Sequence, residues 1–346
     1  MVTLAVDAMG GDHAPREIVR GAAAALQGRQ DLELLLVGRR EQVEQALEGI
    51  DYPAERLKLI HADEVIQGDD HPALAIRRKK RSSLVTALRL VREGEADAIL
   101  SAGNTGALMA GALLVLGRLP GVTRPALLAV IPGFGEKPFV LVDAGANMDA
   151  RSGHLLQYAF MGRIYARKLL NRPAPKVALL NVGAETNKGN RQLKKAFPLL
   201  QEYLDGFCGN VEGTDLFSGA ADVVVCDGFV GNILLKTVEG LGRAVFGRFA
   251  RELAGELSSP AGSSPVEPAL ARLRNQVEGA GYGGAPLVGV KGLCIKCHGS
   301  SQARSIEQAV LHQAYPFVRL KLEDLFLEDL REMSGCLEEK ELPELS

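Results

Sequence analysis

The sequence predicts an α/β protein with a mostly parallel sheet and helices on both of its faces. Short apolar runs alternate with segments of helical periodicity along most of the chain, an order that is typical of βαβ connections. Polar, glycine-rich turns follow several of the apolar runs. Because ligands bind beyond the carboxyl ends of the strands in such sheets, we expect the functional site at these turns.

Composition and charge exclude several classes of protein. The 346 residues are 47% hydrophobic and 24% charged, as in a globular chain with a large core, and the net charge of −2 gives no general attraction to nucleic acid or anionic lipid. The apolar run over residues 106–117 is too short to span a bilayer. The chain shows no signal peptide and has five cysteines, so we expect a cytoplasmic protein with reduced thiols.

The first strand and helix are predicted at the N-terminus, where an apolar run over residues 4–7 ends in a carboxylate. A helical pattern follows, with one apolar face formed by Ile18, Val19, Ala22 and Leu26. The turn between them contains Gly10, Gly11, Asp12, His13 and Pro15. Glycines allow close approach to the backbone, and the free amides at a helix start favour an anion such as phosphate. An ordinary strand-to-helix turn is the alternative.

The remaining elements continue the alternation. Apolar runs predict strands over residues 33–37, 57–60, 97–100, 127–131, 139–143, 176–181 and 222–226. Helical patterns lie between many of them, over residues 41–47, 84–93, 107–116, 154–170 and 191–204. We assign these elements to one catalytic domain, residues 1–332.

A long amphipathic segment interrupts this order at residues 230–257, with apolar side chains at spacings of three and four. A connector rich in Ser, Pro and Gly and a second short helix follow it. We expect a projecting helical hairpin at about residues 230–279, which either forms a dimer contact or packs on its own domain. Residues 333–346 are expected to form an acidic C-terminal tail.

Polar turns follow four of the later strands. They contain Ser101 to Gly106, Asp143 to Asn147, Asn181 to Gly189, and Cys226 to Asn232. One such turn is weak evidence, but several on one sheet predict a shared cleft.

Six passages then carry a specific resemblance. They cover residues 7–15, 101–106, 209–213, 226–232, 281–286 and 298–301. In this order they resemble the bacterial acyl-[acyl-carrier-protein]:phosphate acyltransferase family, the PlsX family, over residues 1 to about 330. The resemblance implies a fold similar to phosphate acetyltransferases and isopropylmalate dehydrogenase. It implies transfer of a long-chain acyl group from acyl carrier protein to inorganic phosphate, giving acyl phosphate for phospholipid synthesis.

The resemblance also implies partners. It implies a homodimer, peripheral contact with the inner face of the cell membrane, and a glycerol-3-phosphate acyltransferase that acts next. We expect no cofactor, no metal and no nucleic acid. The cysteine-rich passage at residues 294–298 matches a haem attachment pattern, but without an export signal we interpret it as structural.

The resemblance assigns catalysis to Lys188 and Asn232, with Asn232 donating to the oxyanion and Lys188 supplying positive charge. His13 either gives a proton to the leaving sulfur or caps the helix and orients Asp12. His298 either lines the cleft or is structural. Phosphate and substrate are expected to bind at Asp7, Gly10, Gly11, Asp12, Ser101, Gly103, Asn104, Thr105, Asp143, Asn147 and Asp227.

Basic side chains offer a docking surface for an acidic carrier protein. The candidates are Arg77, Arg78, Lys79, Lys80, Arg243, Arg248 and Arg251.

Three other functions remain open at this point. They are a coenzyme A-dependent phosphate acetyl- or butyryltransferase, a nicotinamide-dependent hydroxyacid dehydrogenase, and a non-catalytic membrane scaffold.

Overall fold

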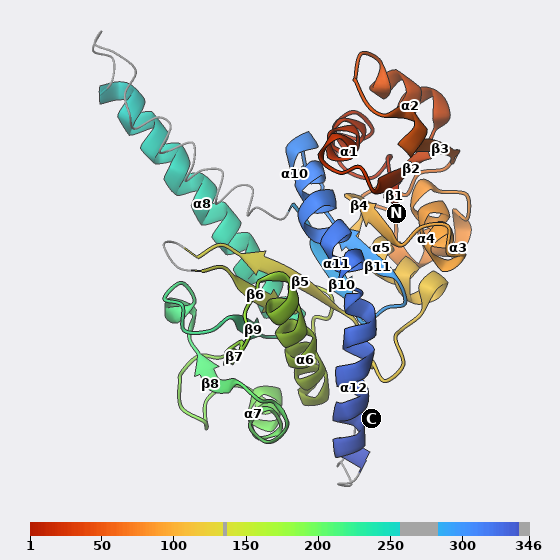
Figure 1. Ribbon diagram of the computed structural model, residues 1–346. Helices are drawn as coiled ribbons and strands as arrows, with labels where there is room; N and C mark the ends of the chain where they lie inside the picture. Colours follow the sequence, from red (N-terminus) through yellow and green to blue (C-terminus); the bar gives the residue numbers. More distant parts are fainter. Residues whose placement is uncertain (134–136, 257–282, 339–346) are drawn as a thin grey trace.

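One sheet of eleven strands runs through the molecule (Figure 1), a computed structural model that describes residues 1–133, 137–256 and 283–338. The strand order is β3-β2-β1-β4-β11-β10-β5-β6-β9-β7-β8. The strands are β1 (Val2–Asp7), β2 (Leu32–Gly38), β3 (Leu57–His61), β4 (Ala98–Ser101), β5 (Ala126–Ile131), β6 (Phe139–Val142), β7 (Val177–Leu180), β8 (Phe207–Val211), β9 (Val223–Val225), β10 (Ala285–Val288) and β11 (Leu293–Lys296).

Helices connect most of these strands. They are α1 (Arg16–Gly28), α2 (Arg40–Leu47), α3 (Pro72–Arg78), α4 (Ser83–Arg92), α5 (Thr105–Gly111), α6 (Ser152–Leu169), α7 (Arg191–Tyr203), α8 (Gly228–Glu256), α10 (Ala303–Gln308), α11 (Tyr315–Arg319) and α12 (Leu322–Glu338). Two π-helical turns, Ala112–Leu116 and Ala309–Ala314, and two 3-10 turns, Ala54–Arg56 and Gly213–Asp215, complete the set.

The sheet consists of two parallel halves that run in opposite directions. Strands β3, β2, β1, β4 and β11 are parallel to one another, and so are β6, β9, β7 and β8. Antiparallel pairing of β11 with β10, β10 with β5, and β5 with β6 joins the halves. The carboxyl ends of the two halves therefore point to opposite edges of the sheet.

Hydrophobic cores cover both faces of this sheet, as the alternation of side chains along a strand requires. On β1, Leu4 and Val6 belong to the core that packs under α1, α6 and α12, whereas Ala5 belongs to the core under α4 and α5. Helix α8 packs on the second face only near its start, and Figure 1 shows the rest of it projecting from the body of the molecule.

The predicted α/β fold and its mostly parallel sheet are confirmed. All eight strands expected from apolar runs are present, within two residues at each end. Strand β8 and helices α3 and α11 were not among the predicted elements. The helix expected over residues 107–116 is α5 continued by a π-helical turn.

The structure describes only part of the expected helical hairpin and part of the expected acidic tail. Helix α8 supplies the first arm of the expected hairpin, whereas the second helix lies outside the described residues. Helix α12 continues to Glu338, six residues into the expected acidic tail, and the remainder of that tail also lies outside the described part. Within residues 1–133, 137–256 and 283–338, none of the helices has the length and apolar character needed to span a bilayer.

Candidate active site

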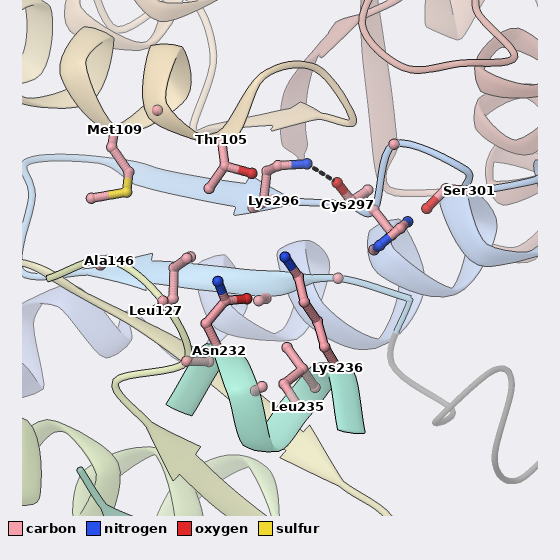
Figure 2. A pocket seen from close by; sticks show the side chains of 18 of the residues that line it. Thr105, Met109, Leu127, Ala146, Asn232, Leu235, Lys236, Lys296, Cys297 and Ser301 are labelled. Atoms are coloured by element: carbon pink, nitrogen blue, oxygen red, sulfur yellow. Dashed lines mark hydrogen bonds between the residues drawn. The ribbon is translucent and has the colours of Figure 1, made fainter. Parts of the chain in front are cut away.

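A cavity of about 830 Å³ lies on the sheet face that α5 and α8 cover (Figure 2). Its walls include residues that follow the carboxyl ends of β4 and β11 in one half of the sheet. They also include the turn after β6, in the other half. Residues from three of the predicted polar turns, 101–106, 143–147 and 226–232, therefore meet there. The turns after β1 and β7 do not line it.

The cavity is lined partly by apolar and partly by polar side chains. The apolar wall is formed by Met109, Ala110, Leu113, Leu127, Ala129, Val130 and Leu235. The polar side chains are those of Thr105, Asn232, Lys236, Glu239, Lys296, His298, Ser301 and Ser305. Figure 2 shows Asn232 and Lys236 rising from α8 and Lys296 on the opposite wall.

Asp7 and Ser101 act on the turns rather than on the cavity, because both are buried. The Ser101 hydroxyl donates to Asp7 Oδ2 at 2.7 Å and accepts the Gly103 N–H at 3.1 Å. Burial raises the pKa of Asp7, against the opposing effect of these hydrogen bonds. Gly10 fits closely over this pair, since a Cβ there would lie 2.6 Å from Asp7 Oδ2 and 2.8 Å from the Gly103 nitrogen.

Four other residues of the expected phosphate cradle, Gly11, Asp12, His13 and Asn104, do not line the cavity. Asp12 and His13 are exposed, and the Asp12 N–H donates to the Gly299 carbonyl at 2.8 Å. Gly11 adopts a positive φ of 112°, which only glycine adopts readily. Asn104 caps α5 by accepting the Ala107 N–H at 3.0 Å and donates its amide to the Gly68 carbonyl at 2.9 Å. Its side chain is thus committed to the local fold.

Asp143 organises the turn after β6. Its Oδ1 accepts the N–H groups of Leu127, Gly145 and Ala146 at 3.1, 3.0 and 2.8 Å, and its Oδ2 accepts the backbone and side-chain N–H of Asn147 at 2.7 and 3.1 Å. The carboxylate is fully buried. Burial raises its pKa, and the donated hydrogen bonds oppose that rise. Both carboxylate oxygens of Asp143 are thus engaged in hydrogen bonds within the protein.

The same turn fixes the start of α8 and so places Asn232. Asp227 Oδ1 accepts the Val230 N–H at 2.8 Å and caps the helix. A Cβ on Gly231 would lie 1.9 Å from the Asp143 carbonyl oxygen, so only glycine permits this approach. Asn232 then packs against Gly145 and lines the cavity.

Lys188, the second expected catalytic residue, lies on the turn after β7. It is exposed and its ammonium is 3.9 Å from Glu185. The turn is held by Asn181, whose amide donates to the Lys188 carbonyl at 3.2 Å. Lys188 does not line the cavity that contains Asn232.

Sequence reasoning missed two lysines of the cavity, Lys236 and Lys296. Lys236 lies one helical turn after Asn232, a spacing that could have indicated it. Lys296 lies in the passage interpreted as structural, and β11 pairs it with Ser101 of β4. His298 follows and lines the cavity, with its Nδ1 2.8 Å from the Ser300 hydroxyl oxygen.

The expected docking charges lie on two surfaces. Arg77, Arg78 and Lys80 are exposed at the end of α3, whereas Lys79 is paired with Asp70. Arg243, Arg248 and Arg251 are exposed on α8. The described residues contain no group of three or more His, Cys, Asp or Glu side chains arranged to hold a metal ion.

Comparison with known proteins decides the relationship. A family model described as "Fatty acid synthesis protein" (FA_synthesis) matches residues 2–322. The chain belongs to this family. A phosphate acyltransferase of Desulforamulus reducens is 48% identical to this chain over 310 residues, which cover 90% of this chain and 92% of that protein. One from Moorella thermoacetica is 49% identical over 307 residues, covering 89% and 90%.

The resemblance to phosphate acyltransferases is thereby confirmed. Among solved structures, a phosphotransacetylase from Streptococcus pyogenes has a TM-score of 0.61 at 17% identity and covers 92% of this chain and 94% of its own. At this identity the likeness supports the shared fold, in agreement with the fold expected for this family.

Proposed function

We propose that this chain transfers a long-chain acyl group from the thioester of acyl carrier protein to inorganic phosphate, giving an acyl phosphate for phospholipid synthesis. The observation that carries the proposal is the cavity, which joins an apolar wall to a polar end inside a chain related to phosphate acyltransferases. Its volume of about 830 Å³ lies within the range of small-molecule sites. An acyl chain fits the apolar wall, and the thioester and phosphate fit the polar end.

The chemistry needs donors more than a strong base. Phosphate is an anion at neutral pH, and the leaving thiol has an ordinary pKa of about 8.5. The oxygen of phosphate attacks the thioester carbonyl, and the resulting oxyanion needs hydrogen-bond donors. The Asn232 amide, held by the Asp143 turn, is suited to donate to it.

The proposal includes two protein partners, the acyl carrier protein and a glycerol-3-phosphate acyltransferase. The acidic carrier protein would meet the basic residues of α3 and α8, and a glycerol-3-phosphate acyltransferase would use the acyl phosphate. Helix α8 also exposes Phe229, Ile233, Leu241, Val245 and Phe249. An exposed apolar stripe of this kind suits a second subunit or the membrane surface.

The test is acyl phosphate formation, trapped with hydroxylamine as the hydroxamate. With palmitoyl-carrier protein as donor, we expect hydroxamate only when inorganic phosphate is present. Hydroxamate from acetyl- or butyryl-coenzyme A alone would assign the chain to short-chain transfer. No product from either donor would refute the proposal, and absorbance at 340 nm with nicotinamide cofactors would then test the dehydrogenase alternative.

A further inference from the structure

Lys296 is a lysine of the cavity whose charge has no obvious use in the fold. It ends β11, where its neighbour across the strand pair is Ser101 of β4. Its side chain is largely withdrawn from solvent and lines the cavity. Burial lowers the pKa of Lys296, and the negative charges of Asp7 and Asp12 act in the opposite direction.

The hydrogen bonds of Lys296 leave donor capacity for a ligand. Its ammonium donates to the carbonyl oxygen of Cys297 (Figure 2) and lies 3.5 Å from that of Ala102. An ammonium has three N–H donors, and both partners here are neutral. Within the part of the chain that the structure describes, no carboxylate lies within ion-pair distance of Lys296. An anion that binds beside a half-buried cation of this kind stabilises its charged form.

The surroundings of Lys296 select the kind of anion. Thr105 and Ser301 bring hydroxyl groups to the same cavity, and Asn232 brings an amide from the facing wall. A compact, strongly hydrated ammonium beside hydroxyl and amide donors suits phosphate. The apolar side chains of Met109, Leu113 and Leu127 line another part of the cavity and suit the acyl chain.

We propose that Lys296 binds the attacking inorganic phosphate, an inference that rests on the proposed acyl transfer. A phosphate oxygen forms the new bond to the thioester carbon while the Lys296 ammonium holds the charge on the other phosphate oxygens. The C–S bond then breaks, the sulfur leaves with the electron pair as a thiolate, and the thiolate takes a proton from water. Lys188, on the turn after β7, is not required to hold this phosphate.

The test compares Lys296→Met and Lys296→Gln with Lys296→Arg and with Lys291→Met. Lys291 is an exposed lysine just before β11 that lies outside the cavity, so Lys291→Met is the matched control. Removing a hydrogen bond to a charged group should raise the KM for phosphate about 10- to 100-fold in the neutral variants. The KM for the acyl donor should stay at the wild-type value, and Lys296→Arg should retain part of the phosphate affinity.

A second readout does not depend on catalysis. Inorganic phosphate should raise the Tm of the wild type and of Lys291→Met, and this shift should disappear in the neutral Lys296 variant that folds, as judged by circular dichroism. An unchanged KM for phosphate together with an unchanged Tm shift in that variant would overturn the assignment. A Lys296-dependent Tm shift in a protein without acyl transfer would instead preserve the phosphate site and refute the proposed function.

Discussion

The replacement Asp143→Asn tests how the site is built. The Asp143 carboxylate only accepts hydrogen bonds, three at Oδ1 and two at Oδ2. Asparagine keeps one oxygen and replaces the other with an NH2 group. In either orientation of the amide, at least two N–H groups would face another donor instead of an acceptor.

The cost follows from that count. A buried donor left without an acceptor costs about 1–3 kcal/mol, so two of them cost roughly 2–6 kcal/mol. The neutral amide is easier to bury than a carboxylate, whose pKa burial raises here, and this recovers part of the loss. We therefore expect the free energy of unfolding to fall by about 2–4 kcal/mol.

The assay is urea unfolding of Asp143→Asn beside Asp149→Asn, an exposed aspartate on the same turn. The turn supports Asn232 through Gly145, so kcat for acyl transfer should also fall in Asp143→Asn and stay at the wild-type value in Asp149→Asn. Equal stability of the two variants would refute the idea that the buried carboxylate holds this turn.

Three further predictions concern chemistry, pH and docking. Asn232→Ala should lower kcat about 100-fold, roughly 3 kcal/mol of barrier, and a change of only a few-fold in steady-state kinetics would remove its oxyanion role. Burial raises the pKa of Asp7 above its ordinary 3.8, so wild-type stability falls as pH rises from that value towards the folded pKa. Urea titrations through this interval should therefore show Asp7→Asn gaining stability relative to wild type as pH rises, and a constant difference would contradict the shift. Raising salt from about 0.1 to 1 M shortens electrostatic reach from about 10 to 3 Å and should raise the KM for the carrier protein, whereas a salt-independent KM would exclude docking on the basic surfaces.

The sequence predicts the fold well where strands are long apolar runs. Strands such as β5, with its sequence Ala-Leu-Leu-Ala-Val-Ile, bury every residue and leave a clear signal. Strand β8 contains Gly209 and Asn210, which interrupt its apolar pattern, so its signal is weak. The pairing of β11 with β4 joins segments far apart in the chain, which local patterns do not encode.

The residues of the site also differ in how clearly the local sequence indicates them. Asn232 stands in a polar turn that follows a strand, and the resemblance to phosphate acyltransferases assigns it a catalytic role. That Asp143 faces inward, and that Lys296 faces the cavity, depends on strand order: β11 lies between β4 and β10, nearly 200 residues from β4 in sequence. A lysine between two buried cysteines gives no local sign of this placement.

The most direct test of the account is where the acyl chain lies. A palmitoyl-carrier protein with a photoreactive diazirine on its acyl chain can be irradiated with the protein, and the labelled peptides identified by mass spectrometry. We predict labelling of Met109, Leu113 and the β5 residues Leu127, Ala129 and Val130, which form part of the apolar wall. Labelling confined to the exposed face of α8, or to the surface around α3, would contradict the assignment of this cavity to acyl transfer.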